Sequence, residues 1–224
     1  MSVLSIAAFA LPFSGCGKIV GNASDKGAKS GAVRNLTENI SKNDSGSKAA
    51  DNEFKTAAAS FSADLFKYNY SNGKTTLVSP LSVLTALALV QNGAEGETLA
   101  QLERALGGLD RNTLNEYMRA YCDFLSAGDE LKIANSVWTD SSVEAKQAFL
   151  QKAVDSYSAQ IFSAPLSSEK TVSSINSWVK KNTDDMIPKI IESADRDAVM
   201  MLINAIAFDA KWETPYKRSD IEKL

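Results

Sequence analysis

The apolar run Val199–Phe208 is the feature that most constrains the fold of this chain, because a single amide side chain, Asn204, lies at its centre. The run shows no alternation of apolar and polar residues, so a strand formed here must be buried on both faces. A buried amide requires hydrogen-bond partners, although Asn204 could also mark a bulge or simply meet backbone groups. The sequence therefore predicts a central strand of a sheet that is covered on both sides.

The sequence ahead of this strand predicts several helices and two further strands. Helical spacing of apolar residues, or typical capping residues, predicts helices over 54–68, 80–90, 98–106, 114–125, 143–157 and 172–179. β-Prone or alternating residues predict strands over 75–78 and 131–138. Helices that come first and then mix with strands argue for an α+β fold with a mainly antiparallel or mixed sheet.

The helix over 80–90 is apolar nearly all round, so it should lie inside the domain. Ser79 is a typical N-cap residue, and Pro80 suits the first helical turn. Gly93 suits the C-terminal cap of this helix.

The composition argues against several classes of function. The chain has no histidine, so it can hold neither a Ser/His/Asp triad nor a His-ligated zinc ion. Its 24 basic residues are spread among 27 acidic ones, which provides no basic surface for nucleic acid. Asp184 and Asp185 could suggest an acid pair, but adjacent acids after a helix are usually a solvated end. We therefore expect no enzymatic activity, no metal and no other cofactor.

The N-terminal residues resemble an export signal. An apolar run from Val3 to Phe13 is too short to span a bilayer, which takes about 20 residues, but suits the core of a signal peptide. Small residues before Cys16 resemble the lipobox of bacterial lipoproteins, a family in which the peptide is cut before the cysteine and the cysteine is lipidated. This resemblance implies a signal peptide over 1–16 and an extracytoplasmic, membrane-anchored protein; a secreted, extracellular protein is the alternative.

The segment 17–52 that follows is predicted to be a flexible tether. It is rich in Gly, Ser, Asn, Lys and Ala, with few large apolar residues. Such a segment cannot bury enough apolar surface to offset the entropy lost on ordering. A flexible tether is consistent with a domain that is held at a membrane by lipid on Cys16.

Four blocks of sequence, in this order, resemble the serpin family of serine protease inhibitors. They are TLVSPLS with the ALA and GAEGET that follow (76–98), IANSVW (133–138), INSWV (175–179) and LINAIAFDAKWETPY (202–216). The resemblance implies that residues 53–224 are the N-terminal part of a serpin domain. The implied fold is an incomplete serpin fold, with the N-terminal helices and part of the large central sheet.

The resemblance also implies structural roles for four residues. Ser79, Ser82 and Asn204 fall at positions of the serpin "shutter", where serines at the start of a buried helix lie close to an asparagine of the central strand. Trp212 falls at the position of a tryptophan in the "breach" at the top of the sheet, and ordinary core packing is its alternative role. We expect Asn204 to be hydrogen-bonded and Trp212 to be largely buried.

In serpins, a protease cleaves an exposed reactive centre loop, forms an acyl-enzyme and is trapped when the loop inserts into the large sheet. The resemblance therefore implies an inhibitor of serine or cysteine endopeptidases, with the target protease as its partner. The reactive centre loop is expected to lie beyond Leu224, so this chain should be inactive alone and should expose an apolar sheet edge. A non-inhibitory serpin-like lipoprotein with a binding or structural role is the alternative.

Overall fold

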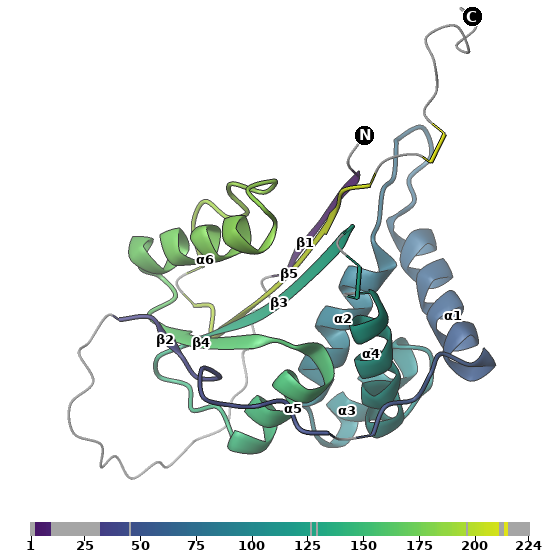
Figure 1. Ribbon diagram of the computed structural model, residues 1–224, viewed down its shortest axis with the longest axis horizontal. Helices are drawn as coiled ribbons and strands as arrows, with labels where there is room; N and C mark the ends of the chain where they lie inside the picture. The colour runs from purple at the N-terminus through teal and green to yellow at the C-terminus, as the bar shows by residue number, and fades with distance from the viewer. Residues whose placement is uncertain are drawn as a thin grey trace, which may run out of the picture.

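The computed structural model describes residues 3–9, 32–44, 46–125, 127–128, 130–195, 197–210 and 213–214 (Figure 1). The helices are Asn52–Asn69 (α1), Pro80–Gln91 (α2), Gly96–Ala105 (α3), Arg111–Leu125 (α4), Gln147–Tyr157 (α5) and Glu169–Asn182 (α6). The strands are Val3–Phe9 (β1), Arg34–Asn35 (β2), Leu131–Asp140 (β3), Gln160–Ala164 (β4) and Met200–Phe208 (β5). Trp212 and Cys16 lie outside the described residues.

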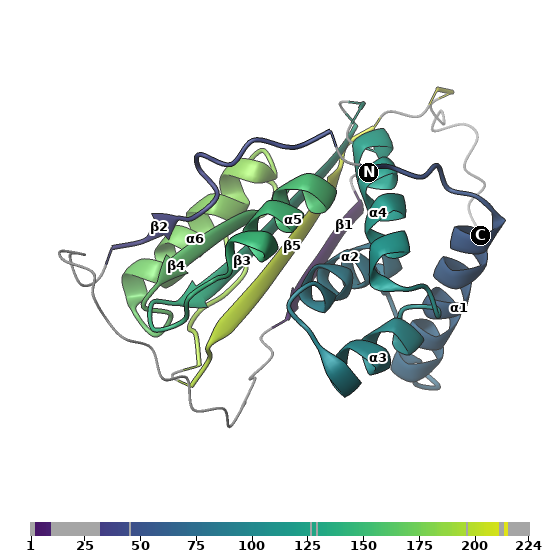
Figure 2. The ribbon, with the colours of Figure 1, turned by 90° about the horizontal axis from the view of Figure 1, so that it is seen from below.

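The strands form one mixed sheet in the order β1-β5-β3-β4-β2 (Figure 2). β5 is antiparallel to both of its neighbours, β1 and β3, whereas β3 and β4 are parallel. The prediction of an α+β fold with a mixed sheet is therefore confirmed, and the strand predicted from Val199 to Phe208 is an interior strand of that sheet, between β1 and β3.

Helices cover both faces of the sheet. α6 lies on one face, and α2, α4 and α5 lie on the other (Figure 1). Alternate side chains of β5 enter the two cores: Leu202 packs with the cluster of α1, α2, α4 and α5, whereas Ile203 and Ala205 pack with α6. This double burial explains why the run 199–208 shows no alternation of apolar and polar residues.

Local capping residues set the start of the main helices. The side chain of Asp51 accepts hydrogen bonds from the backbone N–H groups of Glu53 and Phe54 at the start of α1. Ser79 caps α2, as predicted, and Pro80 is its first residue. α3 begins at Gly96, two residues before the predicted start, because Glu95 rather than Thr98 takes the N-cap position.

Three short segments differ from the sequence prediction. Residues 143–146 were predicted to be helical, but they precede α5, which begins at Gln147. Residues 75–78 are not a strand; they connect α1 to α2 without a strand partner among the described residues, and Leu77 is 75% exposed. β4 was not predicted, because its five residues show no repeat that distinguishes them from the helix that precedes them. Its identity as a strand comes from pairing with β3, whose Trp138 stacks on Phe162 at 4.2 Å between ring centroids.

Part of the segment expected to be a tether packs against the domain. β2 pairs with β4, and the backbone N–H of Leu36 donates to the carbonyl oxygen of Ile161 at 2.7 Å. Farther along, the backbone N–H of Asn43 donates to a carboxylate oxygen of Asp155 at 2.8 Å. Within residues 32–44, backbone N–H groups donate hydrogen bonds to β4 and α5, which lie far away in the sequence. This part of the segment is therefore held against the domain and is not a flexible tether.

β1 occupies the edge of β5 that was expected to be exposed. Its residues pair with β5 from Val3 opposite Phe208 to Phe9 opposite Leu202. The apolar composition that makes 3–13 resemble a signal-peptide core also suits a strand beside β5. The β5 edge is therefore paired along most of its length in this structure.

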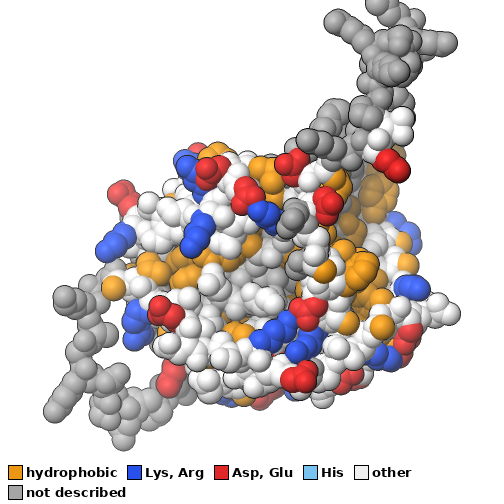
Figure 3. Space-filling view, in the orientation of Figure 1, with side chains coloured by type: hydrophobic (Ala, Val, Ile, Leu, Met, Phe, Trp, Pro, Cys, Tyr) orange, Lys and Arg blue, Asp and Glu red, His pale blue; other side chains and the backbone are white. Residues whose placement is uncertain are grey.

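Large apolar side chains reach the surface on the side of α1 and α2 (Figure 3). Tyr68 is 92% exposed, and Phe66, Tyr70 and Leu77 are also exposed. None of the helices in the described part of the chain is both long and apolar enough to cross a lipid bilayer.

Candidate functional site

The centre of β5 carries a buried pair of asparagines. Asn204 lies opposite Asn135 of β3 in the register of the sheet, and the two side chains are 1% and 5% exposed. The amide nitrogen of Asn204 donates to the side-chain oxygen of Asn135 at 2.7 Å. The prediction that Asn204 is hydrogen-bonded is confirmed, and the partner is a side chain of the neighbouring strand.

A chain of hydrogen bonds continues from this pair behind the sheet. The amide nitrogen of Asn135 donates to the backbone carbonyl oxygen of Tyr157, at the end of α5, at 3.0 Å. The hydroxyl of Tyr157 donates to the side-chain oxygen of Asn115 on α4 at 2.5 Å. Asn115 and Asn92 exchange amide hydrogen bonds of 2.7 and 3.0 Å. The polar path therefore links β5 and β3 to the ends of α5 and α2.

Burial governs the ionisation of Tyr157. Its phenol is almost fully enclosed by the core, and this desolvation raises its pKa far above the usual range. The hydroxyl therefore stays protonated and serves as the donor to Asn115 throughout the physiological pH range.

Ser79 and Ser82 form a second polar pair at the start of α2. Their hydroxyl oxygens lie 3.0 Å apart, and the hydroxyl of Ser79 also accepts from the backbone N–H of Ser82 at 3.4 Å. Ser82 is fully buried, and α2 packs against β5. No hydrogen bond among the described residues joins either serine to Asn204, so the structure gives Asn204 a partner other than the predicted serines.

Several polar atoms of this region have no hydrogen-bond partner in the described part of the chain. They are the side-chain oxygen of Asn204, the hydroxyl of Thr85 and both amide atoms of Gln91. Thr85 and Gln91 are fully buried on α2. The side-chain oxygen of Asn204 is therefore available to accept a hydrogen bond from another group.

Sequence reasoning missed the partners of Asn204. Asn135 lies in the block 133–138, which predicts a strand and resembles serpins, but neither pattern gave Asn135 itself a role. The signal that could have identified it is an amide on the apolar face of an alternating strand, in line with Leu131, Ile133 and Val137. Asn92, Asn115 and Tyr157 had no such signal, because they lie near helix ends where polar residues are common.

The two adjacent acids at the end of α6 do not act together. Asp184 forms an ion pair with Lys132, and Asp185 lies 3.8 Å from the amine of Lys180. Both aspartates have left-handed backbone angles, with φ of 46° and 62°, and exposed side chains. Their carboxylates are thus engaged by different lysines rather than paired for acid–base chemistry.

Comparison with known proteins identifies the family. A family model described as serpin (serine protease inhibitor) matches residues 56–224. The chain is 35% identical to Serpin-Z2A of Oryza sativa subsp. japonica over 159 residues, which is 66% of this chain and 38% of that protein. It is 31% identical to the leukocyte elastase inhibitor of Bos taurus over 175 residues, which is 73% of this chain and 46% of that protein.

A solved structure gives the same result. The native-state crystal structure of the thermophilic serpin Tengpin superposes with a TM-score of 0.76 at 42% identity, over 84% of this chain and 49% of Tengpin. The chain spans half or less of the length of these relatives. The family model covers most of the chain, and the fold agrees with that of a solved member, so the chain belongs to the serpin family.

Proposed function

We propose that this domain supplies the receiving sheet of an inhibitor of serine or cysteine endopeptidases. The observation that carries the proposal is the geometry of β5: β3 pairs with one edge, while the other edge accepts an apolar antiparallel strand, β1. A cleaved loop that inserts into a sheet needs such an edge. The family match and the relatives named as protease inhibitors also support the proposal.

In the proposed mechanism, the nucleophile of the protease attacks a carbonyl carbon of the reactive centre loop. The peptide bond breaks, the new amino terminus leaves, and an acyl-enzyme remains. Insertion of the loop beside β5 then carries the acylated protease away and distorts it before water can hydrolyse the acyl bond, which is an ester for a serine and a thioester for a cysteine nucleophile. The described residues provide the sheet and its polar path.

The polar path beneath β5 supports this role. Asn204 holds β5 to β3 through Asn135, while its unpaired side-chain oxygen can accept a donor from an incoming or neighbouring strand. A typical hydrogen bond contributes about 0.5–1.5 kcal/mol, so such a contact can be exchanged for another at low cost. We infer that Asn204 keeps the sheet closed yet able to open.

A chimera provides the test. Residues 1–224 are followed by the C-terminal part of bovine leukocyte elastase inhibitor, whose name identifies elastase as its target. We expect the chimera to form a covalent complex with leukocyte elastase that resists SDS, and the 224-residue chain alone to form none. The intact bovine inhibitor is the positive control. A folded chimera that elastase cleaves without complex formation would contradict the proposal and favour a non-inhibitory serpin.

We also propose that the protein is extracytoplasmic and anchored to a membrane by lipid on Cys16. The small residues ahead of Cys16 and the apolar run that precedes them support this proposal. The only other cysteine, Cys122, is a poor acceptor for modification, because burial in the core raises its pKa to about 12.

Metabolic labelling tests the anchor. In a bacterial host grown with an alkyne fatty acid, we expect Cys16→Ala to abolish labelling and to move the protein from the membrane fraction to the soluble fraction. The matched control, Cys122→Ala, should retain the label, since its thiol is buried on α4. Equal labelling of the Cys16→Ala variant and the unmodified protein would exclude Cys16 as the lipid site.

A further inference from the structure

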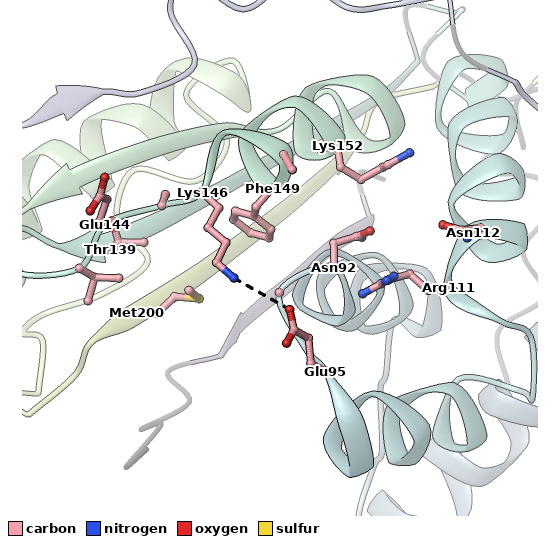
Figure 4. Close-up of a pocket in the computed structure, with 14 residues that line it drawn as sticks. Asn92, Glu95, Arg111, Asn112, Thr139, Glu144, Lys146, Phe149, Lys152 and Met200 are labelled. Atoms are coloured by element: carbon pink, nitrogen blue, oxygen red, sulfur yellow. Dashed lines mark ion pairs between the residues drawn. The ribbon is translucent and has the colours of Figure 1, made fainter. Parts of the chain in front are cut away.

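We propose that a cavity between α2, α4, α5 and the start of β5 binds a small amphipathic carboxylate with an unbranched alkyl chain. The cavity has a volume of about 460 Å³ (Figure 4), which falls within the range of roughly 300–1,000 Å³ typical of ligand pockets. It lies apart from Asn204 and the serine pair. The proposal does not depend on whether the protein inhibits a protease.

The floor of the cavity is apolar. Val143, Phe149 and Met200 lie along it, from the loop before α5, the first turn of α5 and the first residue of β5. An adjoining cavity of about 320 Å³ shares these three residues and adds Val90 and Val199. The two cavities form a continuous apolar surface that suits an alkyl chain, since binding is favoured by each CH₂ group removed from water.

A guanidinium group stands at one end of this floor. In Figure 4, Arg111 and Asn92 lie together on one side of Phe149, and Met200 lies on the other. Arg111 is held there by a hydrogen bond from its Nη1 to the carbonyl oxygen of Ala94 at 3.2 Å. It forms no ion pair with a described residue, so its remaining donors are available to a carboxylate.

The charges that line the cavity favour an anion, although outside the lining the carboxylate of Glu103 accepts from the backbone N–H of Arg111 at 3.0 Å. The lining includes three cations, Arg111, Lys146 and Lys152, against two acids, Glu95 and Glu144, so its net charge is +1. The amine of Lys146 lies 3.9 Å from a carboxylate oxygen of Glu95, which partly neutralises that acid. A single free guanidinium beside a mostly apolar floor fits one carboxylate with an alkyl chain better than a multiply charged phosphate.

The N-terminus of α5 adds to this preference. Its N-cap position is Lys146, whose side chain provides no hydrogen bond to the first turn. That first turn lines the cavity, and its N–H groups carry the positive end of the helix dipole. The dipole, Arg111 and the apolar floor together select a ligand with one negative head and one apolar tail.

Isothermal titration of the 224-residue chain with sodium decanoate, below its micelle concentration, tests the proposal. We expect saturable binding at one site, together with a rise in Tm, because a ligand that binds only the folded state stabilises it. Arg111→Gln should weaken decanoate binding at least tenfold. The matched control Arg104→Gln removes the same charge from the exposed surface of α3 and should change Kd less than twofold.

Two further measurements keep the test decisive if Arg111→Gln fails to fold. Decan-1-ol, which lacks the carboxylate, should bind at least tenfold more weakly than decanoate. Val143→Trp, at a half-buried position, should fill the floor and remove binding while circular dichroism shows an intact fold. Absence of saturable decanoate binding, equal affinity for decanol, or unchanged binding by Val143→Trp would each overturn the proposal.

Discussion

Replacement of Gly107 by alanine is expected to lower the free energy of unfolding by about 3 kcal/mol, a large effect for a single methyl group. Gly107 follows α3 with φ of 100°, and a Cβ atom there would lie 2.7 Å from the Cβ atom and the carbonyl oxygen of Ala57 on α1. These contacts are with backbone and a short side chain, which cannot turn away. The added methyl group must therefore push α3 and α1 apart.

The core around Ala57 leaves little freedom for that shift. Ala57 is 6% exposed, and its helix is held by the buried Phe54 and Phe61. Because protein interiors are close-packed, a displacement of α1 would disturb contacts well beyond Gly107. Thermal unfolding should show a fall in Tm of roughly 6–12 °C, at about 2–4 °C for each kcal/mol in a domain of this size.

The neighbouring glycine is the matched control. Gly108 also has positive φ, 85°, but a Cβ atom there would meet nothing within 4 Å. Gly108→Ala should therefore cost only the backbone strain, about 1 kcal/mol. Equal losses of stability for the two alanine variants would show that the close approach of α1 to Gly107 is unimportant.

Replacement of Asn204 by aspartate is expected to destabilise the fold by about 3 kcal/mol at pH 7. The substitution preserves the shape of the side chain but exchanges the amide donor for a carboxylate. Asn204 is 1% exposed, and the atom that now receives its hydrogen bond is the side-chain oxygen of Asn135. An ionised aspartate would face that oxygen without a donor and would carry a buried charge.

The loss of stability in Asn204→Asp should depend on pH. Desolvation raises the folded-state pKa of a buried carboxyl above its unfolded value of about 3.9. Below about pH 4 the acid is protonated in both states, and its O–H can donate to Asn135, so the penalty is smallest. The penalty should grow as the pH rises from 4 to 7.

Denaturant unfolding of the variant and the unmodified protein at each pH measures this difference. The exposed Asn39→Asp substitution is the control, and its stability should follow that of the unmodified protein at every pH. A constant difference between Asn204→Asp and the unmodified protein from pH 4 to 7 would contradict a buried, ionising carboxyl. Such a constant difference would also argue against the buried hydrogen bond between Asn204 and Asn135.

Local patterns in the sequence were enough to predict the elements that carry their own signal. The apolar run 199–208 supplies the residues that β5 buries on both faces of the sheet. The Ser79-Pro80 pair marks the start of α2. Both signals are local: a strand buried on both faces needs apolar residues at every position, and a helix end needs its own cap. The blocks that resemble serpins added the family and the fold class, which the comparisons confirm.

Contacts between residues far apart in the chain required the tertiary structure. β4 is a strand because β3 lies beside it, and residues 32–44 are ordered by partners more than a hundred positions away, such as Ile161 and Asp155. Asn204 bonds to Asn135 because the register of β5 on β3 places the two opposite each other. The sequence by itself determined that the run 199–208 must be buried and that α2 starts at Pro80. Only the packing of distant segments decided which groups meet, because sheet register and helix docking depend on the whole fold.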